Sequence, residues 1–147
     1  MIATLKHDNG VGIAAPQVFQ SLRIIIVYSY PSPRYPYALE FGPEAMINPK
    51  ITERSKEKEK GWEGCLSIPG IRGLVSRHRK ITVKYTARNG ELKTMKAKDF
   101  VARIIQHEVD HLDGRLCFLF TKESIKDLVT EKVWQKKITE SKKVNKN

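Results

Sequence analysis

The stretch KDFVARIIQHEVDHLDG, residues 98–114, decides the fold, because it predicts a helix that the rest of the chain must cover. Its apolar residues recur three or four positions apart, which is the spacing of one helical face. These residues are Phe100, Val101, Ile104, Ile105 and Leu112. Asp99 is a suitable N-cap and Gly114 a suitable C-terminal stop. We therefore expect one amphipathic helix with its apolar face packed against the remaining chain.

The same helix carries the chemistry. His107 and His111 are four residues apart, so their rings lie on one face, one turn apart, and can bind one cation. Glu108 flanks that cation, where its carboxylate can take a proton from an attacking water and return it to a leaving amine. This pattern favours a metal-dependent hydrolase over two solvated surface histidines.

Two histidines leave the third ligand open, and two cysteines are candidates. Cys117 stands where the metzincin pattern HExxHxxGxxH has its third histidine, but the following FLF suggests a buried core segment. Cys65 lies in GWEGCLSIPG, whose glycines permit a turn that aims backbone N–H groups at a substrate. The sequence therefore favours Cys65.

The other segments predict short antiparallel strands. RIIIVYSY (23–30) indicates a buried strand, and EAMINPKI (44–51) a second one that stops near Pro49. TERSKEKEKG (52–61) has the composition of a solvated connection, and KITVKYTARNGELKTMKA (80–97) that of a hairpin turning at Asn89–Gly90. A last helix is expected from about residue 122 to 136, with Ile125, Leu128, Val129 and Val133 on one face.

The predicted fold class is α+β, with short antiparallel strands around a central metal-binding helix and a C-terminal helix. At 147 residues we expect a single domain over 1–147, with a basic tail that frays from about 137 to 147. No apolar run approaches the ~20 residues that span a bilayer, and the start does not resemble a signal peptide. Two cysteines do not suggest a disulfide framework, so a cytoplasmic location is expected.

The net charge of +11 is the remaining global feature. Residues 122–147 hold eight lysines and four acidic residues, so they contribute +4 of it. A basic surface attracts polyanions such as ribosomal RNA, although a solvated tail that only aids solubility explains the charge equally well. No RNA-binding motif is present, so no sequence-specific nucleic acid is expected as a partner, and no membrane either.

Three motifs together carry a family resemblance: GVGIAAPQ (10–17), EGCLS (63–67) and QHEVDHLDG (106–114). In this order and spacing they resemble the peptide deformylase family, over about residues 1–120. That family removes the N-formyl group from nascent bacterial and organellar proteins. Its members carry a longer segment before the first motif, so this chain is expected to be an N-terminally short member. MIATLKHDNG would then be the end of that segment's helix.

The resemblance implies a role for each motif residue. The implied metal ligands are Cys65, His107 and His111, with Glu108 as general acid and base. Gln17 and the backbone N–H of Leu66 would form the oxyanion hole, where preset donors can contribute several kcal/mol. Arg72 and Arg77 fall where family members carry arginines, and ion pairs are expected for both.

The substrate and the metal also follow from the resemblance. An extended formylmethionyl nascent peptide would lie beside the GVGIA backbone, bordered by Val11 and Gly12, with its methionine side chain near Ile104. The family uses Fe(II), whereas ligand type and the Irving–Williams order favour zinc at a Cys/His/His site. Zinc, nickel or cobalt can therefore occupy the site in a preparation.

Two alternatives remain at this point. One is a small zinc endopeptidase of HExxH type that uses His107 and His111, with Cys117 as a candidate third ligand. The other is a catalytically silent basic protein that binds the ribosome or RNA through its C-terminal region.

Overall fold

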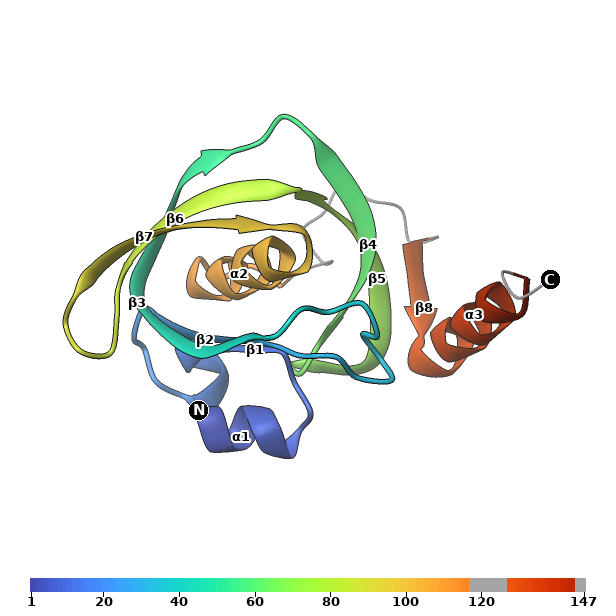
Figure 1. Cartoon of the computed structure of the whole chain (residues 1–147). Helices are drawn as coiled ribbons and strands as arrows, with labels where there is room; N and C mark the ends of the chain where they lie inside the picture. Colours follow the sequence, from blue (N-terminus) through green and yellow to red (C-terminus); the bar gives the residue numbers. More distant parts are fainter. Residues whose placement is uncertain (117–126, 145–147) are drawn as a thin grey trace.

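Two antiparallel sheets surround one central helix in the computed structural model, which describes residues 1–116 and 127–144 (Figure 1). In these ranges the first sheet has the order β1-β2-β3-β6-β7, with β1 Gly12–Ala14, β2 Ile24–Ser29, β3 Phe41–Arg54, β6 Lys80–Thr86 and β7 Leu92–Lys98. The second has the order β4-β5-β8, with β4 Lys58–Cys65, β5 Ile68–His78 and β8 Leu128–Thr130. The helices are α1 Ile2–His7, the 3₁₀ turn η1 Ala15–Val18, α2 Asp99–Leu112 and α3 Glu131–Val144. The predicted α+β class is confirmed.

Helix α2 lies in the space that the curved sheets enclose (Figure 1). Ala102 and Ile105 on α2 are fully buried against β-branched and other apolar side chains of the strands. These include Ile25, Val27, Met46 and Val83. Burial of this apolar face, at about 25 cal/mol per Å², is the main force that holds the helix inside the sheets.

The predicted β2 strand and the β6–β7 hairpin are both confirmed. The hairpin pairs Ile81 with Ala97 and Thr86 with Leu92 around a turn in which Gly90 has φ +86°. That left-handed conformation is one that glycine adopts without steric cost, which explains the Asn-Gly signal.

The strand predicted at 44–51 exists, but its expected stop near Pro49 and the solvated connection expected at 52–61 were wrong. Strand β3 continues through Pro49 to Arg54, and β4 begins at Lys58, so most of the expected solvated connection is strand. Pro49 is tolerated because the β3–β6 register shifts between Ile47 and Lys50, and a bulge requires no ladder hydrogen bond from proline. Pairing with β6 extends β3, and this non-local partner is invisible to a local reading of apolar residues.

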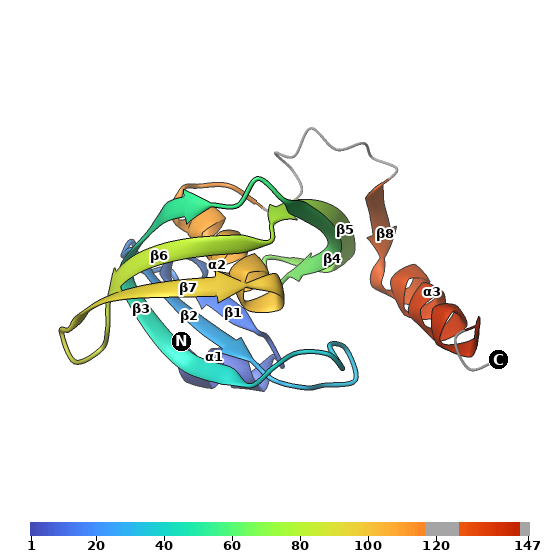
Figure 2. The same ribbon diagram turned by 45° about the horizontal axis from the view of Figure 1, so that its top comes forward.

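The C-terminal helix exists, but its predicted bounds were wrong. Leu128 and Val129 belong to β8, which pairs with the edge of β5, and α3 begins only at Glu131. The part of the predicted helix before residue 127, including Ile125, lies outside the described residues. Helix α3 continues to Val144, past the position where we expected the chain to fray. Figure 2 shows α3 outside the two sheets, reached through β8.

Helix α2 also begins slightly differently from the prediction. Asp99 is its first residue rather than its N-cap, has φ +52°, and accepts a hydrogen bond of 2.7 Å from Arg79. The predicted stop is confirmed, because Gly114 has φ +71° just beyond the helix end. None of the helices in the described ranges has both the length and the apolar character needed to cross a membrane.

Candidate metal centre

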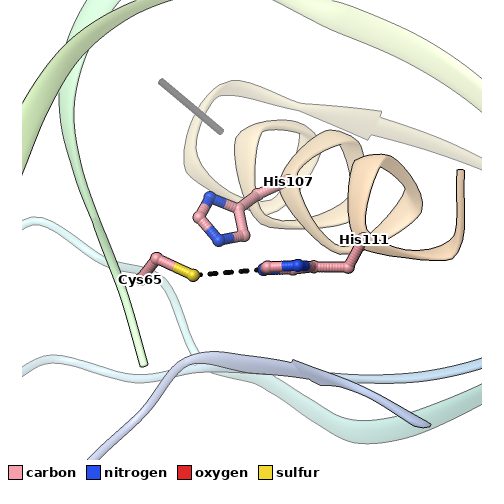
Figure 3. A group of neighbouring side chains, drawn as sticks. All are labelled: Cys65, His107 and His111. Carbon is pink, nitrogen blue, oxygen red and sulfur yellow. Dashed lines mark hydrogen bonds between the residues drawn. The ribbon is translucent and has the colours of Figure 1, made fainter. Parts of the chain in front are cut away.

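Helix α2 and the end of β4 bring three potential ligands together (Figure 3). One ligand atom from each of Cys65, His107 and His111 lies within 4.8 Å of the other two, and Sγ of Cys65 is 3.2 Å from Nε2 of His111. All three residues are buried. Tetrahedral ligands at zinc-like bond lengths are separated by about 3.5 Å, so the spacing and the sulfur and nitrogen donors fit one divalent cation.

Glu63 orients one of the two histidines. Its Oε2 lies 3.0 Å from Nδ1 of His107, which leaves Nε2 of that ring for a cation. Glu63 also accepts two hydrogen bonds of 3.0 Å from Arg77 and one of 2.7 Å from Arg103. Burial would raise the pKa of this carboxyl group, but the hydrogen bonds from His107 and Arg77 outweigh it and lower the pKa to about 2.

The sequence reasoning missed Glu63 as a site residue, although a signal was present. Glu63 and Cys65 are two apart on β4, so their side chains point to the same side of the strand. Both are buried, at 5% and 7% exposure. A carboxyl group on the same buried face as a candidate ligand needs a cationic or histidine partner, and that requirement could have been read from the EGC triplet.

The ion pairs predicted for Arg72 and Arg77 are confirmed. Arg77 bridges Glu63 and Asp110, at 3.0 and 2.5 Å, and so joins β4, β5 and α2. Arg72 pairs with Glu131 at 2.6 Å. Gln106 adds a further link, because its side chain accepts the N–H of His78 and donates to the carbonyl of the same residue. The histidine-bearing helix is therefore tied to β5 by polar contacts as well as by packing.

Glu108 faces the potential ligands from α2. It is buried, and its Oε2 has no hydrogen-bond partner among the described residues. Burial is the main reason that the pKa of Glu108 rises to about 7, since the opposing effects of His107 and His111 are smaller. A carboxyl group with this pKa can both accept and return a proton near neutral pH. Its unpaired oxygen suits a water molecule beside a cation.

Gln17 and Leu66 approach each other from distant parts of the chain. The Oε1 atom of Gln17 accepts the N–H of Ala14 at 2.8 Å, and its Nε2 donates to Oγ of Ser67 at 3.0 Å. Leu66 and Ser67 form the turn between β4 and β5, directly after Cys65. The side-chain amide of Gln17 is thus held beside the turn that carries Leu66. Ser67 as its partner was not anticipated.

A cavity of about 270 Å³ adjoins this centre. Val11, Gly12 and Ile104 line it together with Cys65, Leu66, His107 and Glu108, whereas Gln17 is not among its lining residues. Gly12 leaves no room for a side chain, because an added Cβ would overlap Oε1 of Glu108 and lie 2.8 Å from Cγ2 of Ile104. Among the described residues β1 pairs with β2 and forms the edge of its sheet, so an extended peptide can pair with its other side.

The third-ligand question has one answer among the described residues. Cys65 is the cysteine that joins His107 and His111, while Cys117 lies outside the described residues. The form of the endopeptidase alternative that takes Cys117 as third ligand therefore gains no support from the described residues.

Comparison with known proteins shows which family the chain is similar to. The family model described as Polypeptide deformylase matches residues 1–125. Peptide deformylase 2 of Nostoc sp. is 57% identical over 143 residues, which cover 97% of this chain and 79% of that protein. Peptide deformylase 2 of Pseudomonas putida is 46% identical over 116 residues, which cover 79% of this chain and 65% of that protein. The crystal structure of an Acinetobacter baumannii class I type b peptide deformylase with bound Met-Ala-Ser superposes with a TM-score of 0.78 at 53% identity, covering 80% of this chain and 74% of that one.

Proposed function

Because the chain belongs to the polypeptide deformylase family, we propose that the centre described above carries out the family's reaction, with a defined task for each residue. The protein is a metal-dependent hydrolase that removes the N-terminal formyl group from the formylmethionine of nascent proteins. The observation that carries the assignment of the site is the convergence of Cys65, His107 and His111 beside the buried carboxyl group of Glu108.

Cys65, His107 and His111 would hold the metal. Their donor types and spacing support this, and so does Glu63, which fixes the ring of His107 from the side away from the cluster. When bound, a divalent ion supplies Lewis-acid activation of the attacking water and of the formyl carbonyl.

Glu108 is the proposed general base and acid. It would take a proton from the attacking water as the carbon–oxygen bond forms, and deliver that proton to the amine as the carbon–nitrogen bond breaks. The products are formate and a free N-terminal methionine. Its burial beside the ligands and its unpaired Oε2 support this assignment.

The oxyanion would be stabilised by Gln17 and by the backbone N–H of Leu66. The amide of Gln17 is already held beside the Leu66 turn through Ser67, so only a small change of partner would turn its Nε2 towards a substrate oxygen. Once Nε2 of Gln17 points at the substrate oxygen, both donors are set before the chemical step and stabilise the developing charge without further reorganisation.

The substrate would enter as an added strand. The edge strand β1 offers main-chain groups at Gly12, Val11 precedes it and borders the same cavity, and Ile104 offers apolar surface for the methionine side chain. The crowding around Gly12, Glu108 and Ile104 supports a narrow reaction centre that accepts a formyl group but not a bulkier acyl group.

The test compares three peptides on one metal-loaded sample. Formyl-Met-Ala-Ser should release formate, whereas acetyl-Met-Ala-Ser should react far more slowly because its methyl group meets the wall formed around Gly12 and Ile104. A longer unblocked peptide, followed by mass spectrometry, should remain intact. Internal cleavage without formate release would overturn the assignment in favour of an endopeptidase.

For the identity of the metal we propose Fe(II), as in the family, with zinc, nickel or cobalt replacing it in aerobic preparations. Metal analysis of protein purified with and without oxygen tests this. Iron should be the main metal only in the anaerobic sample, and activity should follow the iron content.

We further propose a cytoplasmic enzyme that approaches the ribosome through its basic C-terminal region. The excess of lysine in residues 122–147 supports this electrostatically. The test replaces Lys136, Lys142, Lys143 and Lys146 by glutamine, which leaves Glu131 and Trp134 intact. Salt-sensitive co-sedimentation with ribosomes should be lost, while activity on short peptides persists. Unchanged co-sedimentation would assign the lysines to solubility.

A further inference from the structure

Arg72 occupies an unusual position for an arginine, in the middle strand of the second sheet. It is only 3% exposed and pairs across the sheet with Gly64 of β4 on one side and Val129 of β8 on the other. A buried guanidinium group is costly unless its donors are satisfied and its charge is paired. The segments that pair with or pack on the guanidinium group of Arg72 are therefore linked to one another through it.

One face of Arg72 belongs to the C-terminal segment, which we define as β8 and α3. Its Cζ lies 4.1 Å from the centre of the Trp134 ring, and Trp134 is itself buried. Glu131, the first residue of α3, accepts hydrogen bonds from Nε of Arg72 at 2.6 Å and from Nη2 at 3.3 Å. This is the bidentate geometry that arginine makes and lysine cannot. The C-terminal segment thus docks on the body of the protein through Arg72.

The other face of Arg72 lies on the backbone next to the metal centre. A Cβ added to Gly64 would lie 2.9 Å from Cζ of Arg72, so the guanidinium rests directly against the Cα of Gly64. The next residue is Cys65, and the β4–β5 register shifts between these two residues. The regular ladder is therefore interrupted at the cysteine, and side-chain packing by Arg72 supports the backbone at this point.

A third contact of Arg72 leads to the histidine-bearing helix. Its Nη1 donates to the hydroxyl of Tyr35 at 2.9 Å. The Tyr35 ring packs on Phe100 of α2, with ring centres 4.7 Å apart. Arg72 therefore contacts β4 at Gly64 directly and α2 indirectly through Tyr35 and Phe100. These two elements carry the potential ligands.

We propose that Arg72 is a positioning residue that couples docking of the C-terminal segment to the geometry of the metal centre at Cys65. With Trp134 and Glu131 in place, the guanidinium is held flat against Gly64 and keeps the Cys65 backbone at the distance that the two histidines require. Without Trp134 and Glu131, the guanidinium group of Arg72 is left buried and only partly paired. It relieves the desolvation cost by turning towards water and away from Gly64. This inference rests on the proposed function only for the presence of a metal at Cys65.

The alternative is that Arg72 stabilises the fold and has no effect on the centre. The two possibilities differ in measurable ways, because a stabilising contact changes the melting temperature, whereas a positioning contact also changes the coordination of a metal in the folded protein. Cobalt(II) is a suitable probe, since its visible spectrum reports ligand geometry and its thiolate band reports the bond to Cys65.

The experiment loads the full-length protein with cobalt and measures the spectrum and the rate of cobalt loss to a chelator, at a temperature where circular dichroism shows full folding. The variants are Arg72→Lys, Glu131→Gln and Trp134→Leu. Trp134→Phe keeps an aromatic face and serves as the conservative rescue. Lys136→Ala is the matched control on the same helix, because its side chain is 79% exposed and contacts Glu140 at the surface.

We expect Arg72→Lys, Glu131→Gln and Trp134→Leu to lose cobalt about 10-fold faster, the size usual for residues that support a ligand, with a shifted spectrum. Trp134→Phe and Lys136→Ala should resemble the unchanged protein. Arg72→Lys combined with Trp134→Leu should be no faster than Arg72→Lys alone, because both act through one contact.

Unchanged cobalt spectra and loss rates in the folded variants, with only a lower melting temperature, would overturn the proposal. If Arg72→Lys does not fold, the two α3 variants decide the outcome on the same criteria. The measurement uses no peptide, so failure of the proposed function appears separately. If the unchanged protein releases no formate but the variants still lose cobalt faster than it does, the proposed coupling holds and the deformylase assignment fails.

Discussion

Replacing Glu63 by glutamine is expected to destabilise the protein and weaken its metal binding together. Glutamine preserves the size of the side chain but removes the charge that His107, Arg77 and Arg103 share. The N–H₂ group of the new glutamine would also face the N–H donors of these partners, so at least one buried guanidinium group is left without a charged partner. Removing one partner from a buried ion pair typically costs about 3–5 kcal/mol.

The pKa of Glu63 provides a second route to this magnitude. Its lowering from 4.5 to about 2 corresponds to about 3 kcal/mol of folding free energy, since a tenfold change in proton affinity is worth about 1.4 kcal/mol. Because folding lowers this pKa, the stabilisation is fully present above pH 4.5 and is lost as the pH falls towards 2. For a chain of this length, about 3 kcal/mol lowers the melting temperature by about 10 °C.

The assay is urea unfolding followed by the fluorescence of Trp62 and Trp134, with metal affinity measured separately by competition with a chelator. Glu63→Gln should unfold about 3 kcal/mol more easily and bind metal about 10- to 100-fold more weakly. Glu59→Gln is the matched control, because Glu59 is exposed on the same strand. If both variants behave alike, the reasoning that Glu63 supports His107 is refuted.

Three shorter predictions concern the chemistry. Glu108→Ala should keep its metal and lose about 10²- to 10⁴-fold in the rate of formate release, and near-normal turnover would sink the proposed acid–base task. Cys65→Ala should lose the metal while Cys117→Ala retains it, as metal analysis of both variants will show; a metal-free Cys117→Ala protein would favour the endopeptidase ligand set. Gly12→Ala places a methyl group against Glu108 and 2.8 Å from Cγ2 of Ile104, so turnover should fall at unchanged metal content. Unaltered kinetics in Gly12→Ala would mean that the crowding at this glycine does not matter.

The sequence by itself determined the features that depend on near neighbours along the chain. The spacing of His107 and His111 places both rings on one face of any helix, and the apolar spacing around them predicts that helix. The Asn89–Gly90 turn was equally legible, because its backbone conformation follows from the two residues alone. The glycine-flanked turn already favoured Cys65 as third ligand, and the family motifs then added Gln17 and Leu66, which spacing could not connect to the helix.

Only the tertiary structure decided the features that depend on partners far away in the chain. Strand β3 runs through Pro49 because β6 pairs with it, and Leu128 lies in a strand because the edge of β5 is available to it. Glu63 supports His107 across 44 residues, and Arg72, which lies against Gly64, pairs with Glu131 of α3 across 59 residues. Local propensity is summed over a few neighbours, whereas the pairing of a buried charge or a strand edge is chosen by packing of the whole chain, and that choice leaves little trace in any short stretch of sequence.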